Sequence, residues 1–198
     1  MKKISRLMAV ALACATILSF AGCSEKKDVK NDQNDQDVVD ISDEDTFFNA
    51  LEKTAGISEK DMMVNEKNAS FDGPDCEIVT FTEDGNNSYC YVRYEEAEDA
   101  MHAFRVRYDS LEELIETKEF DGSNRKMVND KQGYLILDGS VDAGAAFGGM
   151  TFFEKDMHYY GVFYVNGNVY IEIYTLDGTE SDKETIDAVL KEMNLPNM

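Results

Sequence analysis

The chain has 198 residues, of which 40 are Asp or Glu and 19 are Lys or Arg, so its formal net charge is −21. This balance excludes nucleic acid as a partner class, because binding a polyanion needs a basic stripe that releases counterions. The same charge keeps an exported protein soluble and repels it from anionic lipid and polymer.

The N-terminus has the composition of an export signal. Lys2, Lys3 and Arg6 precede an uncharged run of 14 residues, 7–20. The run is too short to span a bilayer as a permanent helix, and small residues follow it. The motif Phe20-Ala21-Gly22-Cys23 resembles the lipobox that ends a bacterial lipoprotein signal peptide.

The lipobox resemblance implies that residues 1–22 are a signal peptide and that Cys23 carries a diacylglycerol. Two acyl chains anchor a protein stably where one is marginal. The expected location is therefore the cell membrane, with the protein lipid-anchored and facing the extracytoplasmic side. An ordinary secretory signal, with Cys23 left free or paired, is the alternative. Residues 1–22 hold three cations and no acid, so cleavage changes the formal charge from −21 to −24.

Residues 23–44 are expected to be the lipidated Cys23 and a disordered acidic tether, because 24–37 has too few apolar side chains to offset ordering entropy. A flexible coil of this length reaches roughly 25 Å from the membrane. Residues 45–198 are a common size for a single domain with its own core.

The first elements of that domain are a helix and a hairpin. Amphipathic spacing predicts a helix from Asp45 to Gly56. Two β-rich runs, 77–83 and 88–95, flank the polar turn 84–87. A turn centred there places Val79, Phe81, Cys90 and Val92 on one buried face.

The same register separates two cysteines that an exported protein could oxidise. Cys76 falls about five positions out of register with Cys90 and on the opposite face of the sheet, beyond disulfide reach. Two free thiols are expected. A metal site is not, because no CxxC spacing or nearby His completes one.

The most secure helix spans 96–117, where apolar residues recur at three-four spacing. A polar loop, a short strand at 134–137 and another strand at 150–153 are predicted to follow. The Gly- and Ala-rich segment between the two strands, 138–149, is interpreted as a flexible connection, or alternatively as a lid or anion cradle.

Asn166-Gly167 predicts a second hairpin, in which Tyr164 pairs with Val169. A last helix is expected to begin with a capping box at Ser181 and to end at Asn194. The predicted fold is α+β: an antiparallel sheet of about five to six strands with helices packed on one face. The hairpin-then-helix units 77–117 and 158–193 can represent a duplication.

This order of elements, together with the lipobox and acidic tether, resembles small uncharacterised envelope lipoproteins of Gram-positive bacteria. The resemblance implies location and fold, and it carries over no functional residues.

The preferred binding surface is aromatic. If helices cover only one face of the sheet, the other face presents rings with hydroxyl tips that suit sugars, peptides or protein surfaces. The residues proposed to line it are Tyr159, Phe163, Tyr170, Glu172 and Tyr174, joined by Tyr89, Tyr91 and Arg93. The alternative is a purely structural role, because Tyr favours half-buried sheet positions.

These observations predict a membrane-anchored extracytoplasmic lipoprotein that acts as a non-catalytic binding or assembly module of the cell envelope. Its partners would be the membrane, through the N-terminal lipid, and an envelope protein, peptide or glycan; no cofactor is expected. The alternative is an envelope hydrolase that uses carboxylates or the pair Asp156 and His158. His102 is expected to be a surface residue. A structural spacer or inhibitor would have neither a pocket nor an exposed Tyr patch.

Overall fold

The computed structural model describes residues 41, 43–68, 71–82, 86–147, 150–151, 153 and 155–198. The signal peptide, Cys23 and most of the proposed tether lie outside these residues, so the predictions made for them stay predictions.

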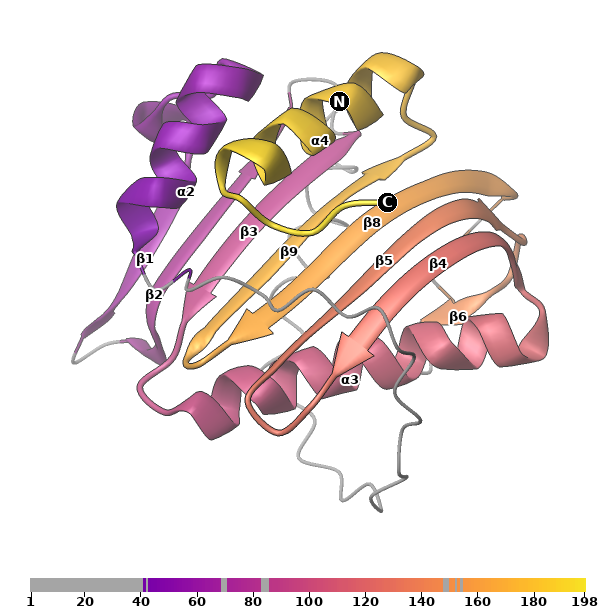
Figure 1. Ribbon diagram of the computed structural model, residues 1–198, viewed down its shortest axis with the longest axis horizontal. Coiled ribbons are helices and arrows are strands. Elements are labelled where there is room, and N and C mark those ends of the chain that lie inside the picture. The colour runs from indigo at the N-terminus through magenta and orange to yellow at the C-terminus, as the bar shows by residue number, and fades with distance from the viewer. Residues whose placement is uncertain are drawn as a thin grey trace.

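One antiparallel sheet of seven strands dominates the described part of the chain (Figure 1). Its strands, in spatial order, are β1 (Met63–Asn68), β2 (Phe71–Phe81), β3 (Asn87–Arg93), β9 (Val169–Leu176), β8 (Met157–Asn166), β5 (Gln132–Val141) and β4 (Phe120–Val128). Two short strands, β6 (Ala146–Phe147) and β7 (Met150–Thr151), pair separately. The α+β class is confirmed, but the sheet is larger than the expected five to six strands.

The extra strands are β1 and β4, which form the two edges of the sheet. The sequence of β4 favours a loop because its residues 121–124 are Asp, Gly, Ser and Asn. Those residues are exposed in the structure, as edge positions commonly are. Propensity alone therefore does not separate an edge strand from a loop.

The three predicted helices are present. Helix α2 (Glu44–Ala50) is capped by Asp43 and continues as the π-helical turn η2 (Leu51–Ala55), which Gly56 ends with a φ of 67°. The short 3-10 helix η3 (Glu59–Asp61) leads into β1. Helices α3 (Ala97–Thr117) and α4 (Glu180–Glu192) complete the set.

The cap of α4 is Thr179 and not the expected Ser181. Thr179 exchanges hydrogen bonds with Asp182, whose backbone N–H donates to the threonine hydroxyl while its carboxylate accepts from the threonine N–H. The helix therefore begins before the expected position. This reciprocal pairing is a capping box.

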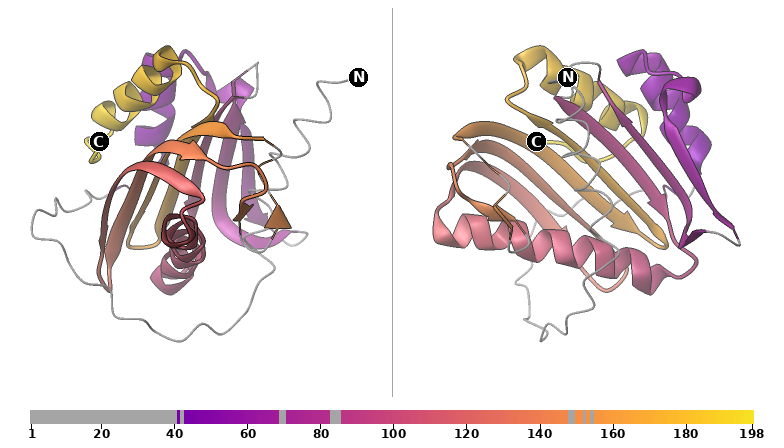
Figure 2. Two further views of the ribbon diagram at one scale, coloured as in Figure 1. Left: turned by 90° about the vertical axis from the view of Figure 1, so that its right-hand side faces the viewer. Right: turned by 180° about the vertical axis from the view of Figure 1, so that it is seen from behind.

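Helices cover both faces of the sheet, which corrects the expectation of one covered face. The sheet curves around α3 on one side, and α2 and α4 pack on the other (Figure 2). Consecutive side chains of β8 from Tyr159 to Val165 are buried, and so are those of β9 from Val169 to Thr175. Since strand side chains alternate between faces, both faces of these central strands must be covered.

This arrangement also argues against a duplicated hairpin-then-helix unit. The antiparallel neighbours β3 and β9 can be exchanged only by a twofold axis perpendicular to the sheet. Such an axis would leave both helices on one face. Because α3 and α4 lie on opposite faces, the two units differ in geometry.

Both hairpins are shifted by two residues from the expected registers. Val79 pairs with Cys90, and Tyr164 pairs with Ile171. The second turn is centred on Gly167-Asn168, with a φ of 57° at Gly167. An even shift leaves every side chain on its predicted face. Cys90 therefore lies on the α3 side and Cys76 on the α4 side; both are buried and neither takes part in a disulfide bond, as expected.

Candidate functional site

The aromatic side chains proposed as a binding surface are buried, which corrects the expectation that they face outward. Tyr159, Phe163, Tyr170 and Tyr174 belong to the core beneath α3. Tyr89 and Tyr91 were grouped with them but belong to the core on the α4 side, opposite Ile173 and Ile171. The cause is that helices cover both faces of the sheet, so these rings pack in the core and form no surface patch.

Two charged residues of the same set have structural partners. Arg93 lies half-buried at the end of β3, and its Nη1 is 2.6 Å from Glu44 Oε2. Glu172 is 2% exposed and forms a bidentate pair with Arg107, with distances of 3.1 Å from Nε to Oε2 and 3.0 Å from Nη2 to Oε1. The Tyr170 hydroxyl also donates to Glu172 Oε2 over 2.7 Å. Charge and hydrogen bonds are thus compensated locally, as burial requires.

Arg107 was not singled out from sequence, although a signal was present. It occupies the apolar stripe of α3, one residue before Tyr108 and three after Phe104. A cation within such a stripe needs a buried anion. Burial, the largest single effect, lowers the pKa of Arg107, but the Glu172 carboxylate together with Tyr170 and Tyr159 raises it by more, so the net shift is upward.

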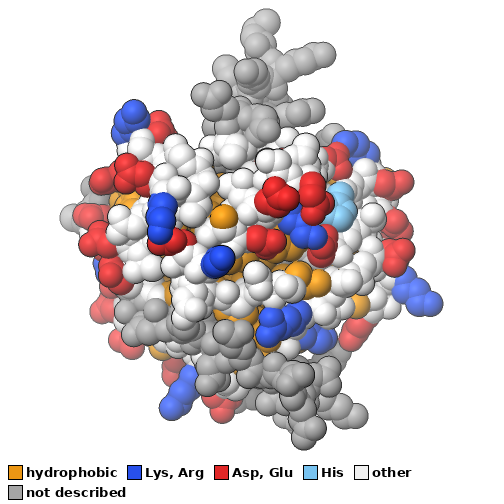
Figure 3. All heavy atoms as spheres, turned by 45° about the horizontal axis from the view of Figure 1, so that its top comes forward, with side chains coloured by type: hydrophobic (Ala, Val, Ile, Leu, Met, Phe, Trp, Pro, Cys, Tyr) orange, Lys and Arg blue, Asp and Glu red, His pale blue; other side chains and the backbone are white. Residues whose placement is uncertain are grey.

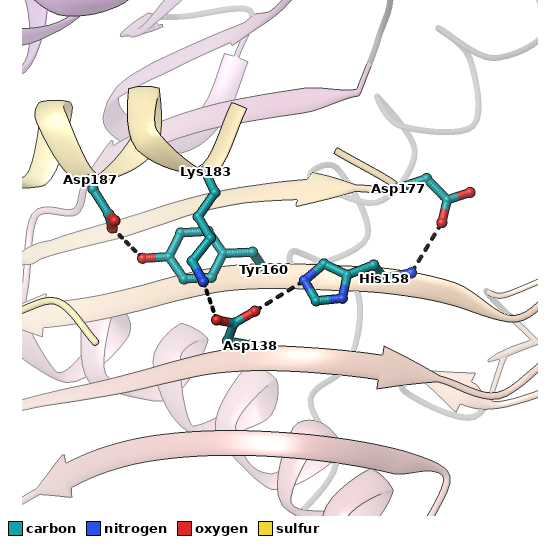
Figure 4. Close-up of polar contacts among 6 residues, drawn as sticks. All are labelled: Asp138, His158, Tyr160, Asp177, Lys183 and Asp187. Atoms are coloured by element: carbon teal, nitrogen blue, oxygen red, sulfur yellow. Dashed lines mark hydrogen bonds and ion pairs between the residues drawn. The ribbon is translucent and has the colours of Figure 1, made fainter. Parts of the chain in front are cut away.

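A second polar cluster lies on the α4 side of the sheet, where acidic and basic side chains intermingle at the surface (Figures 3 and 4). Asp138 of β5 is at its centre. Its Oδ1 lies 3.0 Å from Nε2 of His158 on β8, and its Oδ2 accepts from Nζ of Lys183 on α4. The Lys183 ammonium lies 5.1 Å from the ring centroid of Tyr160, whose hydroxyl donates to Asp187.

The carboxylate beside His158 is therefore Asp138 and not Asp156, which corrects the proposed pair. Asp156 Oδ1 accepts a hydrogen bond from the backbone N–H of Ala143, 2.8 Å away, and so holds the loop after β5. The backbone N–H of His158 donates to Asp177 Oδ1 over 3.0 Å. A hydrogen bond from Lys155 lowers the pKa of Asp177.

The cluster contains an acid, an imidazole and a hydroxyl, the kinds of group that a serine hydrolase uses. The His158 side chain is 44% exposed, and the exposed Ser140 lies directly across from it on β5. Among the described residues, however, Ser140 makes no hydrogen bond to His158, and Asp138 is shared with Lys183. The carboxylate thus contacts both an ammonium and an imidazole and is not reserved for the imidazole.

Other predicted features are less informative. His102 is exposed on α3, as expected. Within the described residues no group of three or more His, Cys, Asp or Glu side chains is placed to hold a metal ion. Part of the Gly-rich segment, 148–149, lies outside the described residues, so its lid or anion-cradle role stays untested. No described helix is long and apolar enough to cross a bilayer.

Two adjacent exposed apolar side chains lie at the β1 edge, a location that sequence reasoning missed. Met63 is 50% exposed and the adjacent Val64 is 42% exposed. In the described part of the chain, β1 pairs only with β2, and no described strand lies beyond it (Figure 1). The opposite edge, β4, instead presents polar residues and the ion pair of Lys126 with Glu112.

Comparisons with known proteins give no family. No protein-family model matches the chain, and no curated protein matches it. Function is therefore inferred from the fold and from the exposed residues of this chain alone.

Proposed function

We propose that this protein is a membrane-anchored extracytoplasmic lipoprotein that acts as a non-catalytic binding or assembly module of the cell envelope. The lipobox-like motif before Cys23 supports the location. The observation that carries the binding role is the edge strand β1, beyond which no described strand lies, with its exposed Met63 and Val64.

An edge strand is a natural site for binding an extended chain. Its outward backbone N–H and C=O groups can continue the ladder, and exposed side chains supply contact area. Natural proteins usually protect such edges with charges, bulges or covering segments. Met63 and Val64 at the start of β1 are uncharged and exposed, with charged residues on either side of them, whereas the aromatic residues first considered for binding are sealed in the core.

Hydrolysis of envelope material is the second candidate, favoured by the alignment of Asp138, His158 and Ser140 on one surface. Labelling the full chain with a fluorophosphonate probe distinguishes the two. The binding proposal predicts no labelling of Ser140, whereas labelling that is lost in Ser140→Ala favours the hydrolase.

Site-specific photo-cross-linking in the protein's own cells tests the binding role. A photoreactive residue at position 64 should give adducts in the membrane fraction. The matched control is position 106, because Val106 on α3 is also exposed, at 37%. The absence of adducts at 64, or equal adducts at both positions, would overturn the proposal.

Fractionation of the same cells tests the lipid anchor. Cys23→Ser should move the protein from the membrane fraction to the medium or periplasm, because the thiol that would carry the lipid is gone. A Cys23→Ser protein that stays in the membrane fraction contradicts lipid anchoring without touching the binding role.

A further inference from the structure

We infer that β1 receives an extended, cationic segment of a partner polypeptide, which adds to the sheet as a further strand. This inference rests on the proposed function and names the chemical class of its partner. It is built from the geometry of the edge, its apolar residues and the charge around it.

The register of β1 fixes what each side of an added strand would meet. Met63 and Asn65 lie opposite Val79 and Glu77, whereas Val64 lies opposite Ile78. Directly opposed residues share a face, so Met63 belongs to the α3 side and Val64 to the α4 side. An incoming strand therefore finds one exposed apolar side chain on each face, at adjacent positions.

The length of the available edge is limited at its far end. The pairing of β1 with β2 shifts between Glu66 and Asn68, which marks a bulge or irregularity. Bulges interrupt a regular ladder and bend the strand. The usable edge is therefore the first part of β1, from Met63 to Glu66, which suits a short extended segment.

The charge around this edge is negative and favours a cationic segment. Glu59 and Asp61 are exposed immediately before β1, and Glu66 is exposed within it. Glu77 lies beside them on β2. Two lysines lie nearby, Lys60 between Glu59 and Asp61 and Lys67, which is bound to Glu95 at 2.6 Å from Nζ to Oε2, so the acids still outnumber the cations. Lysine or arginine side chains on the incoming strand would meet these carboxylates.

The thiol of Cys76, on β2 behind the edge strand, is subject to the same acidic surroundings. Burial raises the pKa of Cys76, and the carboxylates of Glu44, Glu66 and Glu77 raise it further against the opposing effect of Arg93. Three carboxylates therefore act on one point behind the β1–β2 pair. Because Arg93 is paired with Glu44 and offsets it, Glu66 and Glu77 are the carboxylates whose field favours cationic groups at this edge.

A second copy of this chain fits the edge less well. Pairing two β1 strands would place the acids of both copies along one seam, and each chain carries a formal charge of −21. Like charges across a strand pair are destabilising. The charge thus favours a partner of opposite sign over self-association.

The test uses full-length protein in detergent and three capped eight-residue peptides, with binding followed by fluorescence anisotropy. The first peptide alternates Lys and Val. The second alternates Glu and Val, and the third is the Lys-Val peptide N-methylated at every backbone nitrogen. We expect only the first to bind, because the second has the wrong charge and the third has no N–H donors for the ladder.

Matched variants locate the site. Val64→Lys should weaken Lys-Val peptide binding at least tenfold, because an edge lysine blocks strand addition. Met63→Lys should do the same, whereas Val106→Lys on α3 should leave binding unchanged. Glu66→Gln should weaken binding about threefold, the scale of one exposed ion pair. Hydrogen exchange should slow at residues 63–66 when the peptide is bound.

Equal binding of the acidic peptide, or an equal loss in Val106→Lys, would overturn the inference. The outcome of photo-cross-linking at position 64 then separates two failures. Adducts to a partner whose cross-linked segment is not cationic reject only the partner class. Adducts between two copies of this chain reject it in favour of self-association. The absence of adducts rejects the binding role itself.

Discussion

Two charged clusters lie on opposite faces of the strands β8 and β9, and they differ chiefly in burial. Arg107 of α3 and Glu172 of β9 are sealed between helix and sheet, whereas Asp138, His158 and Lys183 of α4 lie partly in solvent. A buried charge that loses its partner cannot be rehydrated, whereas an exposed one can. Similar ion-pair chemistry should therefore be essential on one face and nearly dispensable on the other.

The largest expected effect comes from breaking the buried pair. Glu172→Ala leaves the Arg107 guanidinium uncompensated and should lower the free energy of unfolding by about 3–5 kcal/mol. Urea denaturation measures this loss. Glu113→Ala, at an exposed position of the same helix as Arg107, is the control and should change stability by less than about 0.5 kcal/mol. A loss below about 1 kcal/mol for Glu172→Ala would show that water reaches the site.

A rise in pH above 10 should distinguish the stability contributions of the buried and the exposed cluster. Burial, followed by the charge of Glu172, raises the pKa of Tyr159 and Tyr170 well above 10. The folded state therefore keeps these protons up to a higher pH than the unfolded state does. The stability they contribute is full below pH 10 and is lost as the pH rises above it, by at most about 1.4 kcal/mol per pH unit for each group.

The measurement is the pH dependence of urea unfolding between pH 9 and 11. Tyr170→Phe should reduce the slope, because one buried titrating group is removed. At the exposed cluster, the Asp138 hydrogen bond raises the pKa of Lys183, so its contribution has the same sign. Lys183→Met should reduce the slope less than Tyr170→Phe does. An equal or larger reduction would mean that burial does not distinguish the two clusters.

The smallest effect is expected at the exposed cluster itself. Asp138→Ala removes the partner of both His158 and Lys183 but leaves them accessible to water. The loss of stability should be about 1 kcal/mol or less. Glu116→Ala on α3 serves as an exposed control. A loss above about 3 kcal/mol in thermal or urea unfolding would show that Asp138 locks α4 onto the sheet.

The buried part of the fold was largely readable from sequence. Apolar spacing gave α3, and alternation assigned the side chains of β8 and β9 to the correct faces even though the hairpin register was two residues off. Even shifts preserve faces, so this error had no effect on the predicted core. The strands β1 and β4 were missed because exposed edges carry polar residues that resemble loops.

The candidate sites were less readable. Tyr159 and Tyr170 were correctly placed on one face, but their exposure depended on where α3 would pack. The partner of His158 depended on the β5–β8 register, which brings Asp138 across from a distant part of the chain. The position of β1 at an edge of the described sheet depended on the order of the strands.

The sequence by itself determined the local features of this protein: its helices, the faces of its central strands, its acidic charge and the lipobox-like motif before Cys23. Tertiary structure alone decided which faces are covered, which carboxylate meets His158 and which described strands form the edges of the sheet. The physical reason is the separation along the chain over which each kind of interaction acts. Helix periodicity and strand alternation act between near neighbours, whereas strand order and helix packing are fixed by contacts between distant segments.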